Sequence, residues 1–191
     1  MDVRREKSRE KLRHALAELL RDQSLEQISI EQITDKAGVT RPTFYSNYQS
    51  RQDIIIEHVE HWLARRETLF QAFLEDQQTP EPDRLVAFIE HLLNTLSPDD
   101  TLLQLALSGR AGEQALQRVT NQNTDFFRRR ASRSFNEPPT EDDILLISTF
   151  YGSATIGIIS GVISGKITQQ PADLARQLAA MIYNGIGHRL Y

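Results

Sequence analysis

The 191-residue sequence predicts an all-α fold, with a three-helix N-terminal domain at residues 1–50 and a larger helical domain at residues 51–191. Apolar residues recur at helical spacing along most of the chain, and no alternating strand pattern of useful length occurs. Proline-rich breaks at 79–82 and 136–139 divide the helical stretches. The absence of cysteine excludes a disulfide framework and a thiolate metal site.

The first three predicted helices are short. The first spans about 4–22, with an apolar face that includes Leu12 and Leu16. Ser29 and Gln32 have the spacing of a capping box, which starts the second helix at about 30–36. Thr40 is a good N-cap for the third, at about 41–47, because Pro42 then falls in the first turn.

The later helices have start signals of the same kind. Ser50 with Asp53 caps a long fourth helix that joins the two domains, Ser97 and Pro98 offer a cap and an N1 proline for a short sixth helix, and Thr140 with Asp143 caps the eighth. The fourth to ninth helices are expected at about 51–76, 83–96, 98–107, 112–133, 141–165 and 172–189. The prediction is thus of about nine helices.

Residues 30–54, IEQITDKAGVTRPTFYSNYQSRQDI, contain the most informative pattern. Two amphipathic segments meet at Ala37-Gly38-Val39, as in a helix-turn-helix, and Gly38 can adopt the positive φ that a tight turn needs. Ile33 and Ala37 from the first helix, with Phe44 from the second, offer a small shared core. Exposed positions on the second helix would then face DNA.

This segment resembles the DNA-binding domain of the tetracycline-repressor (TetR) family of transcriptional regulators. The matching stretches are Ile33-Thr34, Ala37-Gly38-Val39-Thr40, Pro42-Thr43-Phe44-Tyr45 and Asn47-Tyr48-Gln49-Ser50-Arg51. Three positions depart from the family pattern: Thr34 replaces alanine, Asn47 stands where an aromatic residue or histidine is common, and Arg51 replaces lysine. The charge at Arg51 keeps the phosphate-binding role, whereas Asn47 leaves base preference open.

Charge is distributed unevenly along the chain. The whole sequence has a net charge of −4, but residues 1–51 alone have 10 Lys and Arg against 8 Asp and Glu. The basic excess therefore coincides with the helix-turn-helix, as a DNA-binding domain requires, although a solvated helix face would also account for the basic N-terminal run. The residues expected to contact DNA are Thr40, Arg41, Pro42, Thr43, Tyr45, Asn47, Tyr48 and Arg51.

Residues 144–165 contain no charged side chain. Gly157, Gly161 and Gly165 recur there at four-residue spacing, which favours close approach of another helix. The TetR resemblance implies that the last two helices form a homodimer interface, to which Leu178 and Ile182 would contribute. Two alternatives stay open, burial within the protomer's own core and a membrane span.

The resemblance also implies a small-molecule effector bound in the larger domain. Residues available to line its pocket are Trp62, Phe70, Phe88, His91, Asn123, Phe126, Phe127 and Tyr151, although each also suits an ordinary core. Nothing identifies the ligand. Glu57, His58, Glu60 and His61 are metal-capable, but an exposed charged face is the simpler interpretation, so no metal or cofactor is expected.

No nucleophile elbow, phosphate-binding glycine loop or HExxH motif occurs, which argues against an enzyme. The N-terminus lacks an apolar signal-peptide core, so a cytoplasmic protein is expected. The sequence and the resemblance together predict a dimeric, sequence-specific transcriptional regulator, a repressor that a small-molecule effector releases from a palindromic DNA operator. The rival is a membrane-anchored helical interaction protein that uses residues 144–165.

Overall fold

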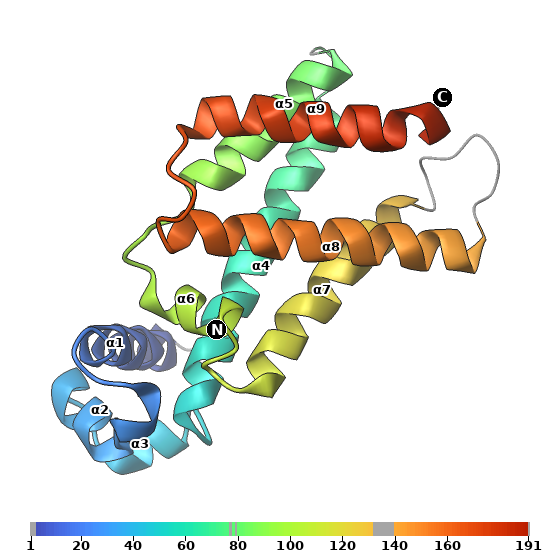
Figure 1. The fold of residues 1–191 in the computed structure, drawn as a ribbon. Coiled ribbons are helices and arrows are strands. Elements are labelled where there is room, and N and C mark those ends of the chain that lie inside the picture. The colour runs from blue at the N-terminus through green and yellow to red at the C-terminus, as the bar shows by residue number, and fades with distance from the viewer. Residues whose placement is uncertain (1–2, 77, 79, 132–139, 191) are drawn as a thin grey trace. The chain divides into compact units, whose positions relative to one another are not determined.

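A computed structural model describes residues 3–76, 78, 80–131 and 140–190, and these residues form only helices and connecting turns (Figure 1). The all-α prediction is confirmed. The helices are α1 (Val3–Leu19), α2 (Ile30–Ala37), α3 (Arg41–Tyr45), α4 (Arg51–Glu75), α5 (Glu81–Asn94), α6 (Thr101–Leu107), α7 (Glu113–Ala131), α8 (Glu141–Ile163) and α9 (Pro171–Leu190), with a 3-10 turn at Leu25–Gln27.

Most predicted helix starts are confirmed, because the caps that define them are local. The hydroxyl of Ser29 accepts a hydrogen bond from the Gln32 N–H, and that of Thr140 accepts one from the Asp143 N–H, each at 3.1 Å. Gly38 follows α2 in the left-handed conformation, at φ 63°, as the turn requires.

Two predictions about helix ends are wrong. Helix α6 begins at Thr101 and not after Ser97, because the Asp100 carboxylate is the N-cap and accepts from the Leu103 N–H at 3.0 Å. Gly165 does not lie within the eighth helix, which ends at Ile163. It follows Ser164 with φ 70°, the left-handed conformation that ends helices.

Smaller differences affect other ends. Helix α5 starts at Glu81 and takes Pro82 into its first turn, where a proline leaves no hydrogen bond unmade. The predicted break at 136–139 and the last two residues of the predicted seventh helix lie outside the described residues.

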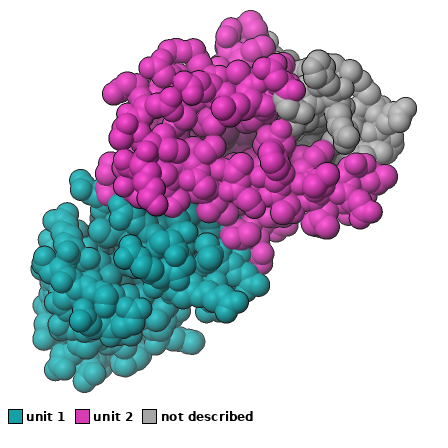
Figure 2. Space-filling view, in the orientation of Figure 1, with its two compact units in different colours: residues 1–62, 99–119 teal, residues 63–98, 120–191 magenta. Residues whose placement is uncertain are grey.

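The chain divides into two compact units, coloured separately in Figure 2. Unit 1 comprises residues 1–62 and 99–119, and unit 2 comprises residues 63–98 and 120–191. Helix α4 contributes to both. The predicted N-terminal domain, residues 1–50, lies within unit 1, and its exact boundary stays a prediction.

Each unit has its own apolar core. In unit 1, α1 and α2 pack together, and Leu12, Leu16, Ile33 and Phe44 are fully buried. In unit 2, α5 packs along α9, with Ile89, Leu93, Leu174, Ala175 and Ala179 buried in one cluster. Unit 1 therefore contains the complete helix-turn-helix with a core of its own.

Candidate nucleic-acid interface

Helix α3 presents a polar face to solvent and a single aromatic ring to the core. Arg41, Pro42 and Tyr45 are exposed, with Tyr45 at 56%. Phe44 is fully buried, as predicted, and packs edge-on against the Tyr45 ring with centroids 5.5 Å apart. The buried ring fixes the helix, so that the neighbouring exposed side chains project from a rigid support.

Three of the predicted contact residues use their polar groups to hold α3 in place. The Thr40 hydroxyl accepts from the Thr43 N–H at 3.3 Å, and the two threonine hydroxyls lie 2.9 Å apart. The Asn47 amide donates to the Thr43 carbonyl at 2.7 Å. Thr43 and Asn47 are half-buried. These hydrogen bonds stabilise a helix of only five residues, which would be marginal without them.

Tyr48, one of the residues expected to contact DNA, is buried. It is 5% exposed, and its hydroxyl donates to the Glu57 carboxylate on α4. Burial, followed by that hydrogen bond and the Glu57 charge, raises the pKa of Tyr48, so the phenol stays a protonated donor. Tyr48 therefore belongs to the buried framework of unit 1 and not to the exposed face of α3.

The basic residues of unit 1 are divided between internal and outward roles. The Arg51 guanidinium donates to the Ile28 carbonyl, and Arg5 donates to the Ser46 carbonyl at 3.4 Å. Arg9 pairs with Glu57, and Lys36 pairs with Glu18 at 3.0 Å. These cations connect segments within unit 1, whereas Arg41 lies on the exposed face of α3. Charge counts along the sequence do not distinguish the two roles.

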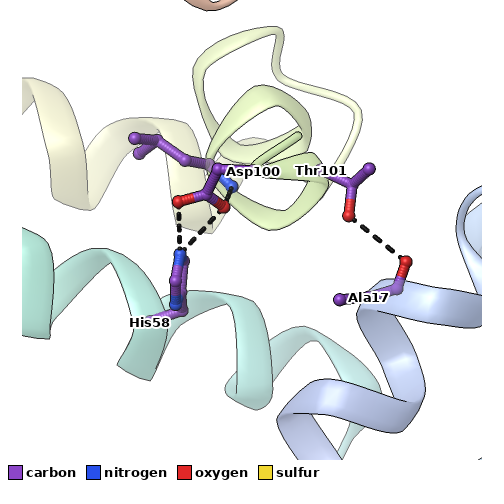
Figure 3. Close-up of polar contacts among 5 residues, drawn as sticks. Ala17, His58, Asp100 and Thr101 are labelled. Atoms are coloured by element: carbon purple, nitrogen blue, oxygen red, sulfur yellow. Dashed lines mark hydrogen bonds and ion pairs between the residues drawn. The ribbon is translucent and has the colours of Figure 1, made fainter. Parts of the chain in front are cut away.

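A second set of contacts attaches the start of α6 to α1 and α4 within unit 1. The His58 ring nitrogen lies 2.8 Å from an Asp100 oxygen, and the Thr101 hydroxyl donates to the Ala17 carbonyl at 3.4 Å (Figure 3). An open groove of about 540 Å³ beside them is lined by both signs of charge, including Lys7, Lys11, His14, Asp99 and Asp100. Mixed charge of this kind favours neither an anion nor a cation. No group of three His, Cys, Asp or Glu able to hold a metal occurs among the described residues.

The sequence of the helix-turn-helix matches that of a known protein family. Residues 12–57 match the sequence model of the bacterial regulatory proteins of the tetR family. Residues 12–57 are thus a DNA-binding segment of the tetR type. The matched stretch contains α2, α3 and the first residues of α4, together with the glycine turn.

Solved structures of similar fold cover nearly the whole chain. A TetR-family transcriptional regulator from Syntrophomonas wolfei is 14% identical with a TM-score of 0.73, over 93% of this chain and 95% of its own. SmeT, the repressor of the Stenotrophomonas maltophilia multidrug efflux pump SmeDEF, is 16% identical with a TM-score of 0.66, over 96% and 90%. The dihydroxyacetone kinase operon activator DhaS is 14% identical with a TM-score of 0.63, over 96% and 98%. Identities this low show the fold alone. No curated protein sequence matches the chain.

The predicted effector residues are mostly brought together in unit 2. Phe70 packs against Phe88 and Phe126 with centroids 5.1 Å apart in each pair, and Phe126, Phe127 and Tyr151 continue the row. Burial raises the pKa of the Tyr151 hydroxyl. Trp62 is buried in unit 1 and His91 is exposed on α5, so neither belongs to this row.

A buried polar relay borders the aromatic row. Arg66 is 4% exposed, its guanidinium lies 4.3 Å from the Phe126 ring centroid, and it donates to the Asn123 side-chain oxygen. Asn123, at 1% exposure, donates in turn to the Gly152 carbonyl at 2.6 Å. The relay joins α4, α7 and α8. Sequence reasoning named Asn123 but missed Arg66, because arginine on an amphipathic helix is usually solvated.

The three glycines predicted to approach a partner helix lie in different surroundings. Gly161 is buried where an added Cβ would lie 2.7 Å from Ile167 of the same chain, so its close neighbour is internal. Gly165 is outside the helix, so Gly157 is the one of these three glycines that is exposed on α8. Leu178 and Ile182 are partly buried against the α5–α9 core.

Sequence reasoning missed the most exposed apolar side chains of unit 2. Leu146 is 65% exposed, Phe150 64% and Met181 66%, and Leu145 is half exposed. Leu146, Phe150 and Gly157 follow one another at helical spacing on the exposed side of α8, a spacing that a stripe facing the protomer's own core would share. Among the described residues, α8 is also the one helix long and apolar enough to cross a membrane.

Proposed function

We propose that this TetR-family chain is a homodimeric repressor that binds a palindromic DNA operator and leaves it when a small molecule binds unit 2. The observation that carries the proposal is the exposed face of α3. Arg41, Pro42 and Tyr45 project beside a buried Phe44, directly after a left-handed glycine turn, within the segment that matches the family.

The chemistry of this face suits the major groove. Arg41 can form two hydrogen bonds to a guanine edge or one to a phosphate, and the Pro42 ring and Thr43 methyl can contact a thymine methyl group. The Tyr45 hydroxyl, on a rigid arm, suits a phosphate oxygen. Thr40 and Asn47 hold α3, and Arg51 acts through the Ile28 carbonyl. The proposed set of direct contacts is therefore smaller than the sequence predicted.

The exposed apolar surface of α8 and α9 supports a homodimer. Leu146 and Phe150 on α8 and Met181 on α9 are each about two thirds exposed, and large apolar surfaces of this kind often mark an interface. A two-fold pairing buries them and doubles the number of DNA contacts, which matches the symmetry of a palindrome. Gly157 is the one predicted glycine that stays a candidate for close contact with the partner.

The effector role rests on the aromatic row of unit 2. In this structure Phe70, Phe88 and Phe126 pack on one another, so a ligand there would have to separate rings. Helix α4 has 25 residues and contributes Phe70 to unit 2 and Glu57 to unit 1, so it is the proposed path of the effector signal. Repression by release is the family's commoner mode. DhaS, with a similar fold, is named an activator, so the sign needs its own measurement.

We place this regulator in the cytoplasm, acting through binding and without catalysis. The membrane-anchored alternative would use the same α8 surface. Cell lysis without detergent separates the two: the regulator stays in the supernatant after ultracentrifugation, whereas an anchored protein sediments with the membranes.

The decisive experiment is selection of DNA by the purified chain. We expect wild-type protein to enrich, from a randomised duplex library, an inverted repeat whose half-sites lie about 34 Å apart or a multiple of it. Enrichment of no sequence, or of one unrepeated half-site, would contradict the proposal. The affinity for the enriched duplex should fall steeply with salt, with a slope of about −0.9 for each phosphate neutralised.

A further inference from the structure

The carboxylate of Glu57 lies where three parts of unit 1 meet. Glu57 is on α4. One of its carboxylate oxygens accepts a hydrogen bond from the Tyr48 hydroxyl, and the other accepts one from the Arg9 guanidinium on α1. The Glu57 side chain is 13% exposed. The Arg9 guanidinium also lies 5.5 Å from the centre of the Tyr48 ring. Both carboxylate oxygens are thus used, each for a different element.

Tyr48 connects this junction to the reading helix. Its backbone N–H donates to the Phe44 carbonyl at 2.9 Å, and its ring lies 6.1 Å from the Phe44 ring, centre to centre. Phe44 in turn packs against Tyr45 on the exposed face. A displacement of the Tyr48 ring would therefore move the buried side of α3, and with it the side chains proposed to touch DNA.

The physical cost of this arrangement argues for a directional role. Removing a carboxylate and a guanidinium from water costs several kcal/mol, and apolar residues of similar volume hold a fold equally well or better. What charged hydrogen bonds add is a defined distance and angle. The exposed pair of Glu60 on α4 and Arg118 on α7, at 38% and 51% exposure, lacks both the burial and the second partner.

We propose that Glu57 is a positioning residue for DNA reading, which holds α3 at the angle to α1 and α4 that specific binding requires, without touching DNA itself. The inference rests on the proposed DNA-binding function. It predicts that loss of the carboxylate lowers affinity for the operator more than affinity for unrelated DNA, because non-specific binding needs only the positive surface and no fixed angle.

The test compares Glu57→Gln and Tyr48→Phe with the matched control Glu60→Gln, using full-length protein. The probes are the palindrome enriched by the wild type and a scrambled duplex of equal length. We expect Glu57→Gln to weaken palindrome binding roughly tenfold and leave scrambled binding within about twofold. The double variant Glu57→Gln/Tyr48→Phe should lose little more than the worse single variant, because the two residues act as one unit. Glu60→Gln should match the wild type.

Hydrogen exchange on the DNA-free protein provides an independent readout. Amides of residues 41–48 should exchange faster in Glu57→Gln and at the wild-type rate in Glu60→Gln. Equal losses on both duplexes with a matching fall in Tm would show a purely structural role and overturn the inference, as would unchanged exchange. If the wild type enriches no palindrome, the proposed function itself fails. A wild-type palindrome that Glu57→Gln binds normally defeats the positioning role alone.

Discussion

Units 1 and 2 are held together by different kinds of interaction. In unit 1, charged and polar side chains join one helix to the next: Arg9 to Glu57, Lys36 to Glu18 and Arg51 to the Ile28 carbonyl. In unit 2, the α5–α9 cluster and the aromatic row are apolar, with Arg66 and Asn123 as a buried exception. Directional contacts in unit 1 suit a rigid reading head, whereas the apolar surface left on α8 indicates that unit 2 has a further surface to bury.

The largest effect should come from a charge on that surface. Phe150→Glu places a carboxylate at the proposed interface, twice per dimer because of the two-fold symmetry. At about 2 kcal/mol for each hot-spot residue, the dimer dissociation constant should rise roughly a thousandfold. Light scattering across a dilution series measures it, with Asn121→Glu on the exposed side of α7 as the control. A variant that dimerises like wild type would remove α8 from the interface.

The next effect concerns the buried exception in unit 2. Asn123→Leu keeps the volume but removes the acceptor for Arg66 and the donor for the Gly152 carbonyl. The free energy of unfolding should fall by about 3 kcal/mol, and Tm by roughly 10 °C. Asn121→Leu, two residues earlier and exposed, should change Tm little. Similar Tm values for the two variants would mean that the relay contributes no stability.

A smaller change in free energy is expected at the reading face. Arg41→Ala should weaken operator binding roughly tenfold per half-site and relax base choice, because Arg41 is proposed to read a base edge. Tyr45→Ala should weaken binding to every duplex similarly, as expected of a phosphate contact. Arg65→Ala, exposed on α4, is the control for charge. Electrophoretic mobility shifts measure binding to the palindrome and to the scrambled duplex. An Arg41→Ala variant that binds both duplexes like the wild type would refute the proposed role of the exposed α3 face.

The smallest effect compares the same cap in both units. Thr40→Ala and Thr140→Ala each remove a hydroxyl that accepts an N–H at the start of a helix, worth about 1 kcal/mol of stability. Only Thr40→Ala should also reduce operator affinity, since it loosens α3. Thermal denaturation and DNA titration of both variants would separate the two roles. Equal DNA affinity in the pair would show that α3 needs no cap to read DNA.

Local signals were readable from the sequence because their partners lie three or four residues away. Ser29, Gly38, Thr40 and Thr140 all act where predicted, and together they define the helix-turn-helix. The start of α6 was misplaced because Ser97 and Asp100 both offer a local cap, and the contact that distinguishes Asp100, to His58, is 42 positions distant. Residue type alone could not decide whether the Tyr48 hydroxyl turns outward or meets Glu57.

The body of the molecule was less predictable for a related reason. A stripe of apolar residues looks the same whether it faces the protomer's own core or a partner, so Leu146 and Phe150 gave no distinct signal. The glycine spacing favoured the approach of another helix, but the nearest neighbour of Gly161 is the Ile167 side chain of the same chain. Long-range packing decided both cases.

Trp62 is the single tryptophan of the chain, and it is 3% exposed on α4 at the last residue of the first segment of unit 1. Selective excitation of this indole therefore gives an emission signal from one known position, on the helix that contributes to both units. A buried indole emits at shorter wavelength than a hydrated one, so any compound that loosens α4 there shifts the spectrum to the red. The protein thus contains its own fluorescent reporter, and candidate effectors can be screened by titration without a dye and without knowledge of the operator.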